Sequence, residues 1–409
     1  MSSFAKMLPE TEIVDLEGGG AVDNQITEDL PDDDALFAPY TYSRSLAKPT
    51  LSKSAKGFTP FPSSIDQSVL DEITKTFKPR DSDIWIVSYP KSGTTWGAEI
   101  LSQVITGESN SAPLGGGIAL GLTSEEHVLW LEALCGKGVA EEVIASINAM
   151  PSDKPRLFKS HAPLEFIKLW TTSKSKVVYL ARNPKDVCVS MWHHSRSKKT
   201  FNYEGPFNHF LNQIFLPGRA ESGSWWSHVG TYFATENWQA VVENDDDDDP
   251  APRLFCLWYE QMLRAPAEGV QGIAEFVGKS VSMVKAEEIA QACSFSSMKK
   301  SEISMGVQGC SIQQDGGGEG DVNNFASSQI RKGGAGNWKD YFTVRQNERF
   351  DKIHQRQLDC GNTAGLGHNL MIDFGDEVKG ADSQMNRMIE LLEGDRGVGG
   401  DGEGGCVIN

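Results

Sequence analysis

A short apolar run, "DIWIVSYP" at 83–90, is the feature that most restricts how this chain can fold. It is rich in β-branched and aromatic residues, which predicts a buried strand. The run ends in a polar loop, "KSGTT", that leads into "TTWGAEILSQVI", where Trp96, Ile100 and Val104 fall on one stripe of a helix. A buried strand that turns tightly into an amphipathic helix is the repeating unit of α/β proteins.

The same pattern recurs further along the chain. "RLFKSHAP", "KVVYLARNP" and "RLFCLWYEQM" are apolar runs with strand character. A helix is expected after the second run, where Asn183 supplies a capping side chain and Pro184 the first helical position. Another is expected over 267–277, after the third run. The alternation predicts a single α/β domain with a central parallel sheet, helices on both faces and ligands bound at the carboxyl ends of the strands.

Composition divides the 409 residues into three parts. Residues 1–57 mix acidic, Gly and Ser/Pro clusters without periodicity, which predicts a flexible N-terminal extension. Residues 58–360 form the expected domain, and 361–409 a Gly-rich C-terminal tail. Within the domain, the acidic run 244–250 and the Gly-rich run 310–321 are expected to be surface insertions.

The totals exclude several classes of protein. A net charge of -18 argues against a general nucleic-acid binder, which needs a basic face. No apolar run approaches the roughly 18 residues of a membrane span, and the first residues have no apolar signal region. The seven cysteines are scattered without CxxC pairing, as expected for reduced thiols, and no His/Cys/Asp/Glu cluster has metal-ligand spacing. We therefore expect a soluble cytoplasmic protein without a metal.

The loop after the first strand can bind an anion. It would present unpaired backbone N–H groups at the positive end of a helix dipole, with hydroxyl donors and the charge of Lys91 beside them. Gly93 would allow a tight turn and a close approach of the anion. The plain alternative is a polar turn with a solvated lysine. The Lys precedes the Gly, which is the reverse of the GxxxxGK[ST] order of nucleoside triphosphate loops.

Four segments, taken in order, resemble the cytosolic sulfotransferases, enzymes that use 3'-phosphoadenosine 5'-phosphosulfate (PAPS) as sulfuryl donor. They are "YPKSGTTW", "FKSHAP", "VVYLARNPKDVCVS" and "RKGGAGNWKDYFTVRQNERF", and the similarity spans about 58–350. The resemblance implies a P-loop-like phosphosulfate loop, PAPS as co-substrate, PAP (3'-phosphoadenosine 5'-phosphate) as product, no metal, and a small-molecule acceptor with a hydroxyl or an amine.

The resemblance also implies how each end of PAPS is bound. The 5'-phosphosulfate loop corresponds to Lys91, Ser92, Gly93, Thr94, Thr95 and Trp96. The 3'-phosphate would be bound by Arg182, Ser190, Arg331, Lys332 and Gly333. The adenine would be enclosed by Trp96, Tyr259, Ser294, Phe295 and Met298. For Arg182 the alternative is a structural salt bridge with Asp186, for the pair at 331–332 a solvated basic loop, and for the two aromatic residues at 259 and 295 core packing.

His161 is the expected catalytic base, because transfer requires removal of a proton from the attacking acceptor and histidine is suited to accept one near neutral pH. Lys91 and Lys159 are expected to stabilise charge on the transferring group. The chain departs from the family at Ala162, where Leu is usual. Two other departures are Cys293, where Thr is usual, and Asn337, where Asp is common.

The expected acceptor is a phenol, alcohol or amine, in a pocket with an aromatic lining formed by Trp192, His193, Phe207, Phe210, Trp225 and Trp226. The family's dimer motif corresponds to Lys339, Thr343, Val344 and Glu348, which implies a homodimer. Cys406 formally begins a prenylation box, but its final Asn is unusual there. The rival functions are a P-loop kinase or NTPase, and a non-catalytic nucleotide-binding relative.

Overall fold

The structure is a computed structural model that describes residues 65, 67–107, 128–135, 139–197, 201, 203–233, 253–299, 332–359, 372–373 and 377–378. The expected N-terminal extension, both surface insertions and the prenylation box at Cys406 lie outside these residues. The division of the chain at 57 and 360 stays a prediction.

The described part is built on a five-stranded parallel sheet with the order β2-β3-β1-β4-β5. The strands are β1 (Ile84–Ser88), β2 (Val128–Trp130), β3 (Leu157–Ser160), β4 (Lys176–Ala181) and β5 (Arg253–Trp258). β1 is buried along its whole length, as its apolar sequence requires, because a central parallel strand is covered on both faces. The sequence prediction of a parallel sheet is confirmed.

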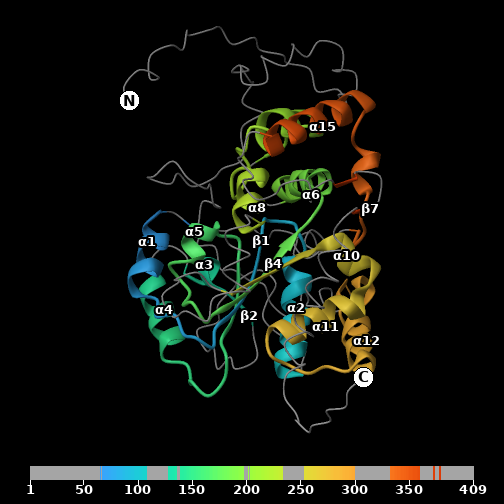
Figure 1. Ribbon diagram of the computed structural model, residues 1–409. Coiled ribbons are helices and arrows are strands. Elements are labelled where there is room, and N and C mark those ends of the chain that lie inside the picture. The colour runs from blue at the N-terminus through green and yellow to red at the C-terminus, as the bar shows by residue number, and fades with distance from the viewer. Residues whose placement is uncertain are drawn as a thin grey trace, which may run out of the picture.

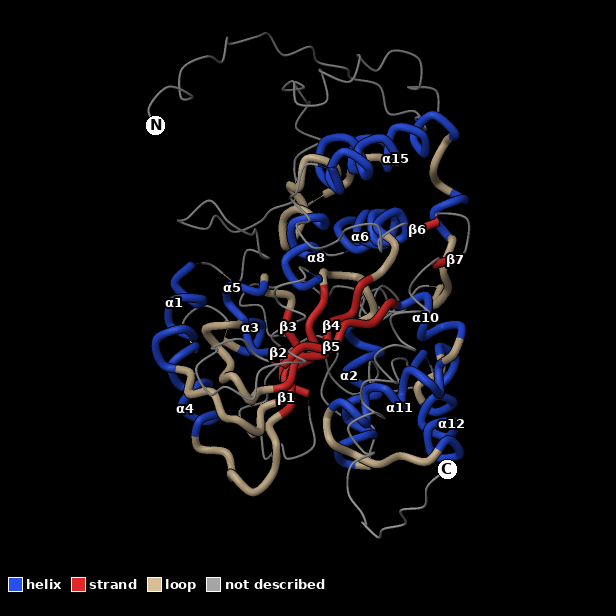
Figure 2. Tube along the Cα trace, in the orientation of Figure 1, coloured by secondary structure: helices blue, strands red, loops and turns tan. Residues whose placement is uncertain are grey.

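Helices cover the two faces of the sheet and its carboxyl end (Figure 1). One face carries α1 (Gln67–Thr76), α3 (Leu131–Leu134), α4 (Ala140–Asn148) and α5 (Leu164–Ile167). The other carries α2 (Thr94–Thr106), α11 (Pro266–Phe276) and α12 (Met283–Ala292). Figure 2 shows α6 (Pro184–Ser197), α8 (Trp225–Phe233) and α15 (Val344–Asp359) beyond the carboxyl ends of the strands. The remaining elements are α7 (Phe207–His209), η4 (Phe210–Phe215), α10 (Tyr259–Arg264), η5 (Asn337–Asp340), β6 (Ile372–Asp373) and β7 (Glu377–Val378).

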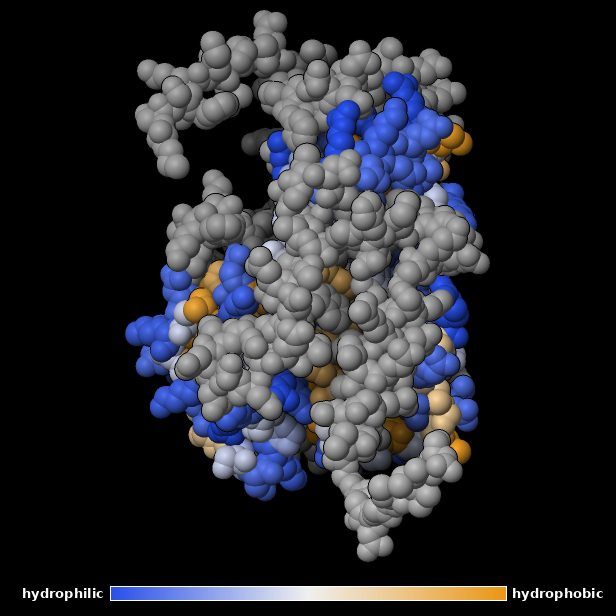
Figure 3. Space-filling model, in the orientation of Figure 1, coloured by the Kyte–Doolittle hydropathy of each residue, from blue (hydrophilic) through white to orange (hydrophobic). Residues whose placement is uncertain are grey.

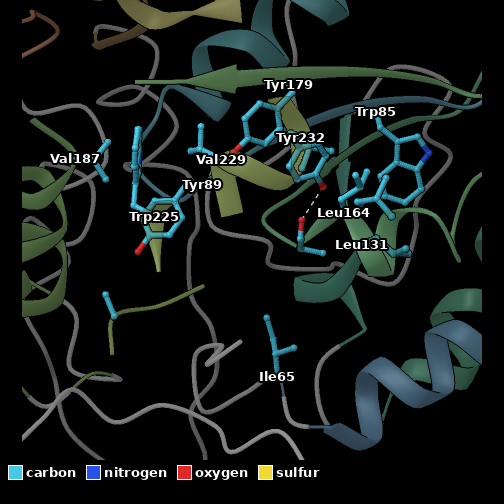
Figure 4. Close-up of a cluster of buried hydrophobic side chains, with 14 of the residues drawn as sticks. Ile65, Trp85, Tyr89, Leu131, Leu164, Tyr179, Val187, Trp225, Val229 and Tyr232 are labelled. Atoms are coloured by element: carbon cyan, nitrogen blue, oxygen red, sulfur yellow. Dashed lines mark hydrogen bonds between the residues drawn. The ribbon is translucent and has the colours of Figure 1, made fainter. Parts of the chain in front are cut away.

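The side chains of β1 alternate between two hydrophobic clusters. Ile84 and Ile86 pack with apolar residues of α2, α11 and α12, whereas Trp85 and Val87 pack with the opposite layer. This follows from the two-residue period of a strand. Figure 4 shows part of the second cluster, in which Tyr179 lies against Tyr232 with ring centroids 4.0 Å apart.

Local sequence signals explain where several elements begin. Asn183 accepts a hydrogen bond from the N–H of Lys185 at 2.9 Å, and Pro184 is the first residue of α6, as predicted. The run "RLFCLWYEQM" was predicted as strand throughout, and this prediction is wrong for its last four residues, 259–262, which belong to α10. The strand ends at Trp258, because the Gln261 side chain accepts the N–H of Trp258 at 3.3 Å and starts α10.

The described surface over α15 is strongly hydrophilic (Figure 3). None of the helices that the structure describes is long and apolar enough to cross a membrane. The four cysteines in the described part, Cys135, Cys188, Cys256 and Cys293, are free thiols. The same residues contain no group of His, Cys, Asp and Glu that could hold a metal ion.

Candidate active site

The loop between β1 and α2 has an unusual backbone. Lys91 has φ of 70° and Gly93 has φ of 103°, both in the left-handed region. A Cβ at Gly93 would lie 2.8 Å from Cδ2 of Tyr259, so the position requires glycine. The hydroxyls of Ser88 and Thr94 are 2.6 Å apart and close the base of the loop. The first turn of α2 therefore presents its N–H groups beside this loop, which suits an anion.

Arg182 joins this loop to a second glycine-containing loop. It follows β4, the strand beside β1, and donates to the carbonyl of Lys91 at 3.2 Å and to that of Gly334 at 3.0 Å. Its guanidinium lies over the Tyr259 ring at 4.5 Å from the centroid. The salt bridge to Asp186 that the sequence left open also exists, at 3.9 Å. One arginine thus connects the β1, β4 and β5 ends of the sheet.

The loop at 332–340 is held by Asp186, in the first turn of α6. The carboxylate accepts the N–H of Gly336 at 2.7 Å and the N–H of Trp338 at 2.9 Å. Gly333 has φ of 65°, and a Cβ there would lie 2.0 Å from the Phe295 ring. Only glycine fits at this position, so the loop backbone contacts the Phe295 ring directly.

The residues that were predicted to enclose the adenine lie close together, near Arg182. Trp96 and Tyr259 have ring centroids 5.3 Å apart at an interplanar angle of 76°, and Phe295 covers Gly333. Ser294 and Met298 occupy the turn that carries Phe295 and are joined by a backbone hydrogen bond of 2.9 Å. The rings line a single region of the molecule rather than separate parts of the core.

His161 lies directly after β3 and is held in one tautomer. Its Nδ1–H donates to the carbonyl of Ser88 at 2.9 Å, which leaves Nε2 as the basic nitrogen. Its ring contacts the Trp130 ring edge to face, with centroids 5.3 Å apart. The pKa of His161 is lowered to about 3, mainly by burial and also by the charges of Lys159 and Lys91, while the bond to Ser88 opposes the shift. The imidazole is therefore neutral at neutral pH.

Lys159, a residue of β3, contacts the same Trp130 ring as His161. Its ammonium lies over the Trp130 ring at 5.2 Å from the centroid, and its side chain is buried. Burial lowers the pKa of Lys159 to about 8, and the nearby Glu132 opposes this shift. Most of the ammonium therefore remains charged at neutral pH, next to the expected base.

The model of the sulfotransferase domain family matches residues 81–362 of the chain. The chain belongs to the sulfotransferase family. Sulfotransferase 1B1 of the dog is 33% identical over 288 residues, which cover 70% of this chain and 87% of the relative. Cytosolic sulfotransferase 1 of the zebrafish is 32% identical over 297 residues, which cover 70% of this chain and 86% of the relative.

Solved sulfotransferase structures share the fold. A mouse sulfotransferase complexed with PAP superposes with a TM-score of 0.51 and 26% identity, covering 75% of this chain and 94% of that chain. Retinol dehydratase in complex with androsterone and PAP gives a TM-score of 0.54 at 22% identity, covering 74% of this chain and 88% of that chain, a likeness of fold alone. The predicted family and fold are confirmed.

The structure of this sulfotransferase brings most of the predicted site residues together, with some exceptions. Arg331 lies outside the described residues. Lys332 is exposed and pairs with Asp340 at 2.9 Å. Trp225 and Trp226 are buried in the hydrophobic core, where the indole of Trp226 donates to His354, so core packing accounts for them.

Three side chains near the site were not predicted from the sequence, and one of them, Glu132, is fully buried. Trp130 is the last residue of β2, a strand of only three residues that was not predicted, and Glu132 lies in the first turn of the following helix α3. Glu260 accepts the N–H of Asn183 at 3.0 Å, and burial raises its pKa to about 7 while Arg182 opposes the shift. The signal for Glu132 was a carboxylate inside an apolar run, "VLWLEAL", since such a charge is seldom buried without a partner.

Proposed function

We propose that this sulfotransferase uses PAPS as sulfuryl donor and transfers the group to a hydroxyl or an amine of a small molecule. The main observation behind this proposal is that His161, Lys159, the loop at 91–95 and Arg182 lie together at one end of the sheet. The mouse sulfotransferase of similar fold was solved with PAP, which supports the donor. PAPS supplies the activated sulfuryl group, and the chain supplies binding, charge and a base.

Two buried polar atoms support the fit of a doubly anionic nucleotide. Among the described residues, the Ser92 hydroxyl and the Nε of Arg182 are buried without a hydrogen-bond partner. Such groups are costly to bury unless something pairs with them. They lie on the two loops assigned to the 5'-phosphosulfate and the 3'-phosphate, respectively. Ser190, two turns into α6, and Gly333 would complete the second anion site.

The base role follows from the tautomer of His161. Because Nδ1 donates to Ser88, Nε2 is the atom that accepts the acceptor's proton. The imidazolium so formed would remain bonded to the same carbonyl. Lys159 and Lys91 would balance the negative charge that grows on the oxygens of the transferring group. The expected reaction needs no metal, because each charged role falls to a side chain.

The decisive variant is His161→Ala. Transfer of labelled sulfate from PAPS should fall by at least about 100-fold, because a positioned base contributes roughly 10²–10⁴-fold. Binding of PAP, measured by calorimetry without Mg²⁺, should stay within about twofold, since the nucleotide would contact other residues. The wild type is first screened against phenols, sterols, flavonoids and aliphatic alcohols. Wild-type turnover in the variant would rule out the base assignment.

The rival functions make different predictions in the same assay. A kinase or NTPase would bind ATP with Mg²⁺ and turn it over, whereas we expect PAP to bind without a metal and ATP to bind weakly. A non-catalytic relative would bind PAP and transfer no label to any acceptor.

We also propose a homodimer through the family motif. Val344 is 76% exposed at the start of α15, unusually open for an apolar side chain, and Lys339, Thr343 and Glu348 are exposed beside it. Light scattering at micromolar concentration should give twice the chain mass, and Val344→Glu should give the monomer. A monomeric wild type would contradict this proposal. The cytoplasmic location stays a prediction that the name of the zebrafish relative supports.

A further inference from the structure

The backbone of the base and the next residue is fixed entirely by side chains. The N–H of His161 donates to Glu132 at 2.8 Å, and its carbonyl accepts from Ser222 at 3.2 Å and from His228 at 3.1 Å. The N–H of Ala162 donates to Ser160 at 2.9 Å. Its carbonyl accepts the hydroxyl of Tyr232 at 2.9 Å, the dashed line in Figure 4. All four polar groups of the dipeptide are thus bonded outside any helix or strand ladder.

Glu132 is the only acidic side chain of this set. The basic one, His228, is neutral at neutral pH, because burial lowers its pKa to about 4. One carboxylate oxygen, Oε1, accepts both the N–H of His161 and the hydroxyl of Ser160, each at 2.8 Å. Ser160 in turn accepts the N–H of Ala162. A single oxygen therefore anchors both N–H groups of the dipeptide, one directly and one through Ser160.

Burying this carboxylate is costly. The Glu132 side chain is 0% exposed, and its second oxygen, Oε2, has no hydrogen-bond partner among the residues that the structure describes. Burial raises the pKa of Glu132, while the N–H groups of His161 and of Glu132 itself and the side chains of Ser160 and Trp130 oppose the shift. A buried carboxylate with an unsatisfied oxygen weakens a fold, so its placement beside the base points to function.

The pairing of β2 with β3 explains how Glu132 reaches the base. Trp130 is paired in register with Lys159, so the residues that follow each strand, Glu132 and His161, meet at the carboxyl edge of the sheet. The same pairing puts the Trp130 ring against both Lys159 and His161. The short segment at 128–132 therefore contacts the base and its neighbouring lysine together.

We propose that Glu132 is a positioning residue that holds His161 at its working place through the main chain, an inference that rests on the proposed sulfuryl transfer. It would touch neither nucleotide nor acceptor. Its loss would let the dipeptide shift while the two anion-binding loops stay intact. A displacement of about 1 Å at a catalytic group can cost on the order of 100-fold in rate.

The test compares Glu132→Gln and Glu132→Ala with the wild type. The amide of Gln keeps an acceptor oxygen but loses the charge, so we expect kcat to fall by about 10-fold, and by about 100-fold in Glu132→Ala. The KM for PAPS and the Kd for PAP should stay within about twofold, because the nucleotide loops are unchanged. The graded loss, with partial rescue by the isosteric amide, distinguishes positioning from general destabilisation.

Glu99→Gln is the matched control. Glu99 is a buried glutamate of α2 that accepts from Gln103 at 2.9 Å, and its substitution should leave kcat within about twofold of wild type. If Glu132→Gln keeps wild-type kcat, or loses PAP binding as much as it loses kcat, the positioning role is wrong. Should Glu132→Ala fail to fold, the Gln variant alone decides. A wild type without PAPS-dependent activity would instead overturn the proposed function.

Discussion

Lys159 shows how a single buried charge can set the activity profile. Its pKa lies near 8 because burial disfavours the ammonium, and the nearby Glu132 offsets part of that cost. At pH 7 the group is mostly protonated, and its charge is lost as the pH rises through about 8. If the ammonium stabilises the transferring group, activity must fall with it.

The variant Lys159→Arg tests this role. Arginine remains charged far above pH 8, so the decline of kcat/KM that we expect above about pH 8 in the wild type should be absent, even if the overall rate is lower. An aliphatic alcohol should be the acceptor, because its hydroxyl does not ionise in this range. The measurement is kcat/KM from pH 6 to pH 10. An identical alkaline decline in both proteins would show that another group titrates.

Individual residues were predictable from the sequence where they directly follow a predicted strand. Lys91, His161 and Arg182 each come at or near the end of an apolar run, and parallel pairing brings such ends to one edge. Glu132 was not predictable in the same way. Its contact with the base depends on the pairing of a three-residue strand, which has too few residues to show periodicity.

At the scale of elements, α6 connects the nucleotide loops to the C-terminal part of the domain. Asp186, in its first turn, holds the loop at 332–340 through two backbone N–H groups. Lys185, beside it, has a fully buried ammonium that pairs with Asp351 of α15 and lies 4.4 Å from the centroid of the Trp338 ring. The helix thus fixes both the second glycine loop and α15.

Asp186→Asn should weaken nucleotide binding. An amide has one acceptor oxygen, and its NH₂ group would face a backbone N–H, so one of two charge-assisted bonds to the loop is lost. We expect the Kd for PAP to rise by about 10-fold, equivalent to about 1.4 kcal/mol. Calorimetry measures it, with Asp81→Asn, an exposed change in the turn before β1, as the control. Equal affinities in the two variants would refute the role of Asp186.

The elements themselves were predictable to different degrees. The four apolar runs contained the whole of β1, β3, β4 and β5, since strands covered on both faces carry a largely apolar sequence. The helix α10 was missed because it follows β5 without an intervening turn and has only six residues, too few to show a helical period. There the side chain of Gln261, rather than hydropathy, decides the boundary.

At the scale of the whole molecule, α15 is packed against the rest of the domain through buried aromatic residues and His354. This histidine is 3% exposed, and its Nδ1 accepts the indole N–H of Trp226 at 2.9 Å. Burial, together with the charge of Lys185, lowers the pKa of His354 to about 4. The folded protein therefore keeps this side chain neutral where an unfolded chain would protonate it.

The consequence is a dependence of stability on pH with a definite sign. Between about pH 6.5 and pH 4 the unfolded chain binds a proton at His354 that the folded protein does not, so acidification favours unfolding. His354→Gln can still accept the Trp226 N–H but does not titrate. Relative to wild type, the variant should gain about 2–3 kcal/mol of unfolding free energy between pH 7.5 and pH 4.5. Urea unfolding at both pH values measures this, and the other titrating groups cancel because both proteins share them. A difference between the two proteins that does not change with pH would show that folding leaves the pKa of His354 unshifted.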